Sequence, residues 1–311
     1  MKPSQFVKAA VAEIREAVGD GAAISALSGG VDSAVVTVLG HKAIGSRLKV
    51  IFIDDGLMRQ GEPKEVKDAF AAMGIKVKVL KVAKRFFEAL AGITDPEEKR
   101  KAFRDTFYKV LGEAVKASGA QYLLQGTIAA DVIETKGGVK TQHNVLEQIG
   151  IDTKKGYGFR ALEPIRTLFK PDVRRVARGL GMPKAFSERM PFPGPGLATR
   201  CVGEVTPKRI EIVRRACKIA EEETVKYKPF QAFGVLLADK ATGLRKNGKR
   251  AFGDIVVFRS VQSEDAMTAT ATQVAWPVLE RIRDRILDAC PTVTKVLLDL
   301  TPKPPSTIEY I

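Results

Sequence analysis

The segment Ser28-Gly29-Gly30-Val31-Asp32-Ser33 follows an apolar run, residues 22–27, and precedes a helix-like apolar segment, residues 34–39. This order predicts a buried strand, a glycine loop and a helix. The first turn of a helix has unpaired backbone N–H groups and a partial positive charge, so it attracts anions. The segment therefore predicts a phosphate site, although an ordinary glycine turn at the start of a helix would occupy the same context.

The spacing inside this loop excludes two common phosphate motifs. No lysine follows the glycines as a Walker-type loop requires, and the G-x-G-x-x-G dinucleotide pattern is also absent from the loop. Instead, the hydroxyl groups of Ser28 and Ser33 flank the carboxylate of Asp32. Because a carboxylate repels a bare phosphate, Asp32 indicates a bridging Mg²⁺ held by this side chain and by phosphate oxygens.

The composition is that of a soluble globular protein large enough for two domains: 311 residues, 45% hydrophobic and 28% charged. No apolar run reaches the length of a membrane span and no signal peptide is evident at the N-terminus, so we expect a cytoplasmic enzyme without membrane association. Cys201, Cys217 and Cys290 lack metal-ligand spacing and predict buried thiols. The net charge of +15 is spread along the chain, which favours polyanionic small substrates over nucleic acid.

Strand and helix patterns alternate after the loop. Apolar runs at 48–53 and 75–80 enclose a segment with helical spacing, Glu62–Met73, and a further strand is expected at 122–125. This alternation predicts an α/β fold with a doubly wound parallel sheet. Ligands of such sheets bind beyond the carboxyl ends of the strands, so we expect the glycine loop and Asp54–Gly56 to line one crevice.

The pattern changes in the second half of the chain. A long polar stretch, 136–158, predicts a mobile lid, and the rigid segment Pro191–Gly196 predicts a domain boundary. Beyond it we expect a smaller α+β domain that mediates dimerisation and whose tail reaches into an active site. Its expected elements are helices at 207–227 and 276–288 and strands at 233–237, 255–258 and 293–300.

The loop resembles the pyrophosphate loop of the N-type ATP pyrophosphatases, which cleave ATP between the α and β phosphates. Further segments resemble, in the same order, motifs of the ATP pyrophosphatase part of the GMP synthetases: 95–101, 125–128, 131–134, 191–197, 267–269 and 303–309. The resemblance implies an adenine nucleotide alpha hydrolase-like ATP pyrophosphatase domain at 1–196. It implies a dimerisation domain with an XMP-contacting tail at 197–311.

The resemblance also implies three groups of site residues. Catalytic roles fall on Asp131, Glu134, Lys140, His143 and Lys170; ATP and pyrophosphate binding on Ser28, Gly29, Gly30, Val31, Asp32, Ser33, Ala34 and Ile53; XMP binding on Arg100, Lys303, Thr307, Ile308 and Glu309. Asp32 is the expected Mg²⁺ ligand. Spacing and side-chain chemistry support three of these assignments. Asp131 and Glu134 would share a helix face, and the point charge of the Lys170 amine suits a phosphate group.

Two positions differ from the family pattern. Gln142 stands where the family has the first of two adjacent histidines, and Gln142 retains hydrogen-bonding capacity without a titratable group. The chain ends Tyr310-Ile311 where the family ends in Trp-Glu, so one carboxylate is missing.

The resemblance implies the closing steps of guanine nucleotide biosynthesis: a ligase that aminates XMP to GMP through adenylyl-XMP, using ATP and Mg²⁺ and releasing AMP and pyrophosphate. No cysteine lies in a Gly-x-Cys-x-Gly elbow, so we expect a separate glutamine amidotransferase subunit to supply ammonia to a homodimer of this chain. Two alternative functions make different demands on the sequence. A tRNA-thiolating enzyme would normally call for cysteine pairs or an RNA-binding appendage, and neither appears. A basic, non-catalytic nucleic-acid module would bind oligonucleotides in a salt-dependent manner without releasing pyrophosphate from ATP.

Overall fold

The computed structural model describes residues 2–136, 159–187, 189–244, 248–264 and 266–311, so nearly all of the predicted lid lies outside the described residues. The chain forms two compact units that alternate along the sequence. Unit 1 comprises Met1–Asp54, Glu62–Lys81 and Arg104–Arg189, and unit 2 comprises Asp55–Gly61, Val82–Phe103 and Met190–Ile311. The functional division at 196 and 197 stays a prediction.

Unit 1 is built on a five-stranded parallel sheet in the order β3-β2-β1-β4-β5. Its strands are β1 (Ala23–Leu27), β2 (Leu48–Asp54), β3 (Val77–Lys81), β4 (Tyr122–Leu124) and β5 (Arg160–Leu162). The central strands β1 and β2 are buried along most of their length, as their apolar runs predict for a sheet covered on both faces. The predicted doubly wound parallel sheet is confirmed.

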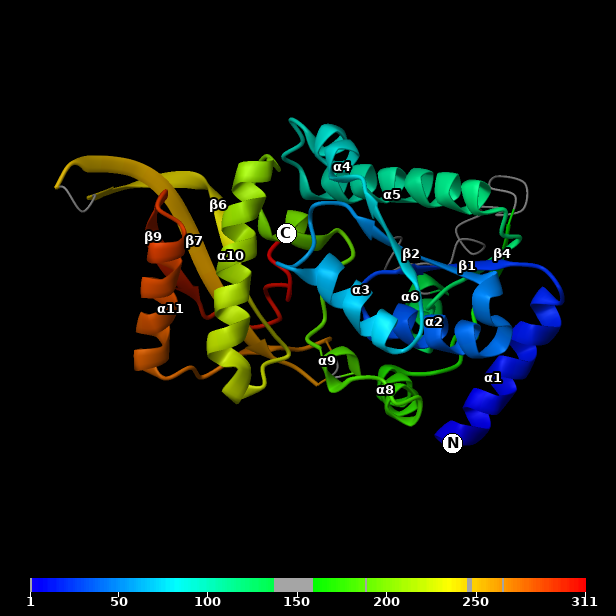
Figure 1. The fold of residues 1–311 in the computed structure, drawn as a ribbon. Coiled ribbons are helices and arrows are strands. Elements are labelled where there is room, and N and C mark those ends of the chain that lie inside the picture. The colour runs from blue at the N-terminus through cyan, green and yellow to red at the C-terminus, as the bar shows by residue number, and fades with distance from the viewer. Residues whose placement is uncertain (1, 137–158, 188, 245–247, 265) are drawn as a thin grey trace. The chain divides into compact units, whose positions relative to one another are not determined.

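Helices flank this sheet (Figure 1). They are α1 (Pro3–Val18), α2 (Val31–Ile44), the short η1 (Gly45–Arg47), α3 (Glu62–Ala72), most of α5 (Pro96–Ser118), α6 (Ala129–Lys136), α8 (Lys170–Gly179) and α9 (Lys184–Ser187). Strand β1 pairs with β2 on one side and with β4 on the other, so the direction of winding reverses between β1 and β4. Ligands of doubly wound sheets bind at this switch point, and the glycine loop follows β1 there.

Unit 2 contains a four-stranded sheet whose centre is β7. Strand β7 (Arg250–Gln262) pairs antiparallel with β6 (Gln231–Leu244) and β8 (Thr270–Ala271), and parallel with β9 (Val293–Asp299). Two long helices, α10 (Pro207–Thr224) and α11 (Trp276–Ala289), pack on the sheet. Unit 2 also contains α4 (Ala83–Leu90), η2 (Gly196–Arg200) and η3 (Val225–Tyr227). The expected α+β architecture of the C-terminal part is confirmed.

Helix α10 begins where the sequence predicts. The Thr206 hydroxyl accepts the backbone N–H of Arg209, and Pro207 occupies the first turn, where its missing N–H costs nothing.

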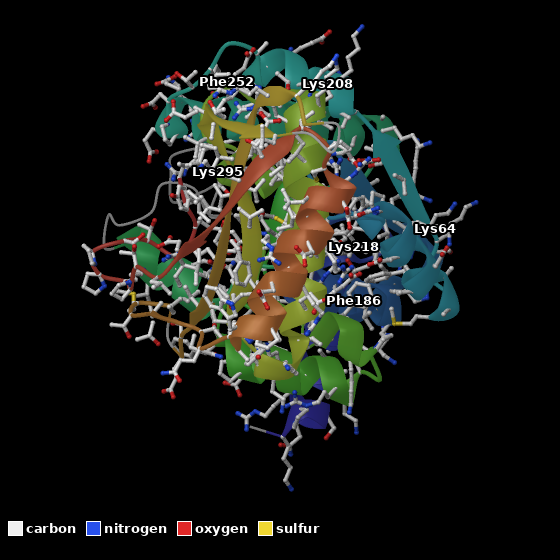
Figure 2. The ribbon with its side chains drawn as sticks, turned by 90° about the vertical axis from the view of Figure 1, so that its left-hand side faces the viewer. Lys64, Phe186, Lys208, Lys218, Phe252 and Lys295 are labelled. Carbon is white, nitrogen blue, oxygen red and sulfur yellow. The ribbon has the colours of Figure 1, made fainter. Side chains whose placement is uncertain are left out.

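All three cysteines are buried and free, as predicted. Phe252 on β7, labelled in Figure 2, is 71% exposed, so this sheet presents apolar surface near the β6–β7 hairpin. Among the described helices, none combines the length and apolar character that a membrane crossing needs.

Candidate active site

The glycine loop forms a closed turn between β1 and α2. Ser33 Oγ accepts the backbone N–H of Ser28 at 3.1 Å, contacts Ser28 Oγ at 3.0 Å and donates to the Gly30 carbonyl at 3.2 Å. Gly29 has φ +73°, a left-handed conformation that favours glycine. Because Ser33 ties the turn together, the first N–H groups of α2 are held in place before any anion binds.

Asp32 lies in the first turn of α2 and pairs with Lys170, the first residue of α8. Lys170 Nζ donates to Asp32 Oδ2, and the two side chains are 40% and 22% exposed. Within the described part of the chain, Asp32 Oδ1 is buried and has no hydrogen-bond partner. An oxygen in that state is suited to bind a cation.

The Asp32 carboxylate fits a Mg²⁺ ion that binds together with a nucleotide. Over the described ranges, no cluster of three or more His, Cys, Asp or Glu side chains forms a ready-made metal cage. Magnesium usually takes only one or two carboxylates and completes its shell with water and substrate phosphates. Asp32 Oδ1 would supply the protein ligand.

The end of β4 packs directly on the loop. A Cβ added to Gly126 would lie 2.8 Å from Ser33 N and 2.9 Å from the carbonyl carbon of Asp32. Nearby, Thr127 Oγ1 donates to Glu163 Oε1 at 2.6 Å, so the residues after β4 and β5 are joined. The carboxyl edge of the sheet thus brings together the residues that follow β4 and β5 and the start of α2, as its parallel topology requires.

The other predicted residues of unit 1 lie at the same edge or outside the described residues. Asp131 Oδ2 accepts the backbone N–H of Ile128 at 3.0 Å at the start of α6, which also carries Glu134. Ile53 is 2% exposed and lies near the end of strand β2, before Asp54. Lys140 and His143, the two lid residues, are outside the described residues.

In unit 2, two buried arginines hold the C-terminal tail. Arg200 is 1% exposed and binds Glu309 through two hydrogen bonds, Nε to Oε2 at 2.9 Å and Nη2 to Oε1 at 2.8 Å. Arg259, also 1% exposed, donates to the carbonyls of Thr307 and Ile308 at 2.8 and 3.1 Å. The tail predicted to contact XMP is therefore fixed within its own unit.

Aromatic rings complete the surroundings of Arg200. Its guanidinium carbon lies 4.2 Å from the Phe233 ring centroid and 5.1 Å from that of Phe192. Burial alone would lower the pKa of this guanidinium, but the neighbouring Glu309 carboxylate raises the pKa above its ordinary value. Arg200 is thus a permanently charged anchor.

The remaining predicted XMP residues of unit 2 lie near this tail or in a pocket. Lys303 Nζ donates to the Ala266 carbonyl at 2.7 Å, and its backbone pairs with Ala269. Arg100 lines a small pocket with Lys99, Thr199 and Ile311. Lys99 donates to the Cys201 carbonyl at 2.8 Å, and burial lowers the pKa of its amine.

Replacing Arg200 with methionine is expected to destabilise the protein by about 3 kcal/mol, because the largely buried Glu309 carboxylate loses its charged partner. Urea unfolding followed by circular dichroism measures this. The double variant Arg200→Met, Glu309→Leu is expected to regain part of the loss, since no unpaired charge remains. A loss under about 1 kcal/mol for the single variant would contradict the anchoring role.

The models of two protein families match parts of this sequence. The family described as "NAD synthase" matches residues 4–194, and the family described as "GMP synthase C terminal domain" matches residues 218–310. One subunit of the glutamine-hydrolyzing GMP synthase of Archaeoglobus fulgidus is 50% identical over 311 residues, covering 100% of both chains. The same subunit of the Pyrococcus horikoshii enzyme is 48% identical and covers 98% of each chain.

A solved structure supports the fold. The NMN synthetase of Francisella tularensis covers 63% of this chain and 78% of its own, with a TM-score of 0.50 and 18% identity. At that identity, the likeness concerns the fold alone. The identity to the curated relatives extends over the full chain, across both units, and the chain therefore belongs to the family of these GMP synthase subunits.

Proposed function

We propose that this chain is the ATP-consuming subunit of a GMP synthase, which activates XMP as adenylyl-XMP and converts it to GMP with ammonia. The observation that carries this proposal is the closed glycine loop at the switch point of the sheet, with Asp32 and Lys170 beside it. Such a loop suits a nucleotide phosphate, and the membership of the chain in a family of GMP synthase subunits supports XMP as the acceptor.

In the proposed reaction, the C2 oxygen of XMP attacks the α phosphorus of ATP, and pyrophosphate leaves. The N–H groups at the start of α2, with Ser28 and Lys170, stabilise the negative charge that develops on pyrophosphate. Ammonia then attacks C2, AMP leaves with the bond electrons, and the nitrogen loses its extra proton to solvent. Bound Mg²⁺ would neutralise phosphate charge, with Asp32 as its protein ligand.

The remaining assignments are part of the same proposal. Asp131, Glu134, Lys140 and His143 act in adenylation, and Arg100, Lys303, Thr307, Ile308 and Glu309 form the XMP site. In that arrangement Arg200 orients the Glu309 carboxylate. The protein works in the cytoplasm as a homodimer joined through its C-terminal domain, without nucleic acid or membrane.

Ammonia comes from a separate glutamine amidotransferase subunit. A glutamine amidotransferase needs an accessible cysteine nucleophile, whereas Cys201, Cys217 and Cys290 are all buried. Burial also raises the pKa of each of these thiols, which disfavours the reactive thiolate. The full-length relatives are named as a subunit of their enzyme, which agrees with an enzyme of more than one kind of chain.

The purified chain is expected to form GMP and pyrophosphate from ATP, XMP and ammonium, and to form no GMP when glutamine replaces ammonium. Separation of nucleotides by chromatography and a pyrophosphate assay measure both products. IMP and AMP in place of XMP serve as control acceptors. Pyrophosphate release with XMP no faster than with these controls would refute the proposed acceptor, and GMP formation from glutamine would refute the need for a partner.

A further inference from the structure

Two residues at the boundaries of unit 1 meet beside the glycine loop. Glu62 is the first residue of unit 1 after Asp55–Gly61, and Arg189 is the last before Met190. Arg189 Nη1 lies 2.8 Å from Glu62 Oε1, and the side chains are 20% and 1% exposed. A carboxylate this deeply buried carries a large desolvation cost, which its arginine partner offsets.

The Glu62 carboxylate lies against Gly29. A Cβ added to Gly29 would be 3.0 Å from Glu62 Cδ and would overlap Oε1. Gly29 is also the loop residue with left-handed backbone, at φ +73°. The carboxylate therefore fills the space that this part of the loop would enter if it moved toward α3.

Packing fixes the elements that carry the ion pair. Glu62 begins α3 and Arg189 follows α9, and Phe70 of α3 meets Phe186 of α9 edge to face, with ring centroids 5.7 Å apart. Phe186 is labelled in Figure 2 and is buried. Because this contact joins the two helices, Glu62 and Arg189 are held in place by α3 and α9. The ion pair would therefore keep its position if the glycine loop moved.

The chain on the other side of each boundary is fixed as well. Arg59 Nη2 donates to the carbonyl of Met190 at 3.0 Å, and Arg59 Nε pairs with Glu221 at 2.9 Å. Arg59 lies in the segment that leads to Glu62, and Met190 directly follows Arg189. Within unit 2, the segment that precedes Glu62 and the segment that follows Arg189 are therefore held together.

We propose that Glu62 and Arg189 are positioning residues for the pyrophosphate loop. The pair holds Gly29 in its left-handed conformation, and the N–H groups that follow it stay aimed at the departing pyrophosphate. This inference rests on the proposed function, since it concerns how the loop used in that reaction is kept in place. Donors fixed in advance need no rearrangement as charge develops, whereas a displacement of about 1 Å costs about 100-fold in rate.

The test compares two carboxylates that face the same arginine. Glu62→Gln keeps the shape of the buried side chain and removes its charge. Glu65→Gln is the matched control, because Glu65 lies 3.6 Å from Arg189 Nη2 but is 64% exposed. The readouts are kcat, the KM values of ATP and XMP, and the inhibition constant of inorganic pyrophosphate, measured where circular dichroism shows the variants folded.

Glu62→Gln is expected to lower kcat and to raise the inhibition constant of pyrophosphate by about 10-fold each, with the KM of XMP unchanged. Glu65→Gln is expected to stay within about two-fold of the unsubstituted protein. Arg189→Met should match Glu62→Gln, and Arg189→Lys should recover most of the loss. The double variant Glu62→Gln, Arg189→Met should be no worse than either single variant, because the two residues act as one unit.

An unchanged inhibition constant in folded Glu62→Gln would overturn the positioning role, as would a variant that loses only thermal stability. If Glu62→Gln does not fold, the comparison of Arg189→Met with Arg189→Lys decides in the same way. A failure of the proposed function can be distinguished from a failure of the positioning role, because the first would be observed in the unsubstituted protein and the second only in the variants. A chain that neither releases pyrophosphate nor binds it would remove that function, and the positioning role with it.

Discussion

Replacing Asp32 with alanine is expected to lower kcat for pyrophosphate release by about 1000-fold or more. The substitution removes the buried Oδ1 atom that we assign to Mg²⁺ and takes away the partner of Lys170. The lysine would then meet the nucleotide without a fixed orientation. A coupled pyrophosphate assay with ATP, XMP and ammonium measures the loss over a range of magnesium concentrations.

Asp172→Ala is the matched control for this experiment. Asp172 also lies in the first turn of a helix, α8, is 28% exposed and pairs with Arg175, but it has no part in the proposed site. We expect its kcat to change by less than about two-fold. Circular dichroism should show the same fold for both variants, and more than about a tenth of the original activity in Asp32→Ala would disprove the metal role.

The second large effect is expected for Gly126→Ala. Gly126 does not have a left-handed φ, so alanine fits its backbone conformation, yet the added methyl group would lie 2.8 Å from Ser33 N. That atom is part of the loop backbone and cannot rotate away. The loop must shift, and kcat is expected to fall by about 100-fold, because misplacement of the phosphate donors by about 1 Å has effects of this size.

Gly179→Ala is the control, because it adds the same methyl group to unit 1 next to a side chain of α1 instead of next to the loop backbone. Gly179 lies at the end of α8, where the added carbon would meet only the Pro3 side chain, at 3.1 Å. Activity within about two-fold of the original is expected, because no phosphate donor is displaced. The helix preference of alanine and the close contact with Pro3 oppose each other, so the expected change in stability is small. If Gly126→Ala showed the same small effect, the close packing of β4 on the loop would have no catalytic importance.

The glycine loop and the sheet could be predicted from the sequence because their signals are local. Strands β1 and β2 are short apolar runs, and a loop between a strand and a helix is indicated by its glycine and hydroxyl residues. The edge strand β5, Arg160–Leu162, lacks such a run and was not predicted. The order of the strands is less local, yet alternation of strands and helices restricts it to a doubly wound sheet.

The buried charges could not be predicted in this way. Arginine is usually exposed, and nothing near Arg200 or Arg259 in the sequence announces a carboxylate or a tail from the end of the chain. Their partners are brought to them only by the folding of unit 2. The same reason applies to Glu62 and Arg189, which lie far apart in the sequence.

The resemblance to GMP synthetases placed Glu309 among the site residues but gave no account of its neighbours. A role can be transferred along a sequence motif, whereas a hydrogen-bond partner depends on the fold. The sequence feature that could have pointed to Arg200 is its position a few residues after the Pro191–Gly196 motif, and this position does not identify its partner. The lid residues Lys140 and His143 stay predictions.

The alternation of the two units along the chain limits how such proteins can be rearranged in evolution or in the laboratory. No single cut separates the units, because Asp55–Gly61 and Val82–Phe103 belong with the C-terminal unit. The Leu57 carbonyl accepts the backbone N–H of Leu197 at 2.8 Å, and Lys99 binds the Cys201 carbonyl. A gene fragment encoding the last third of the protein would therefore lack two segments of the C-terminal unit. An exchange between relatives that keeps both units intact would have to transfer them together.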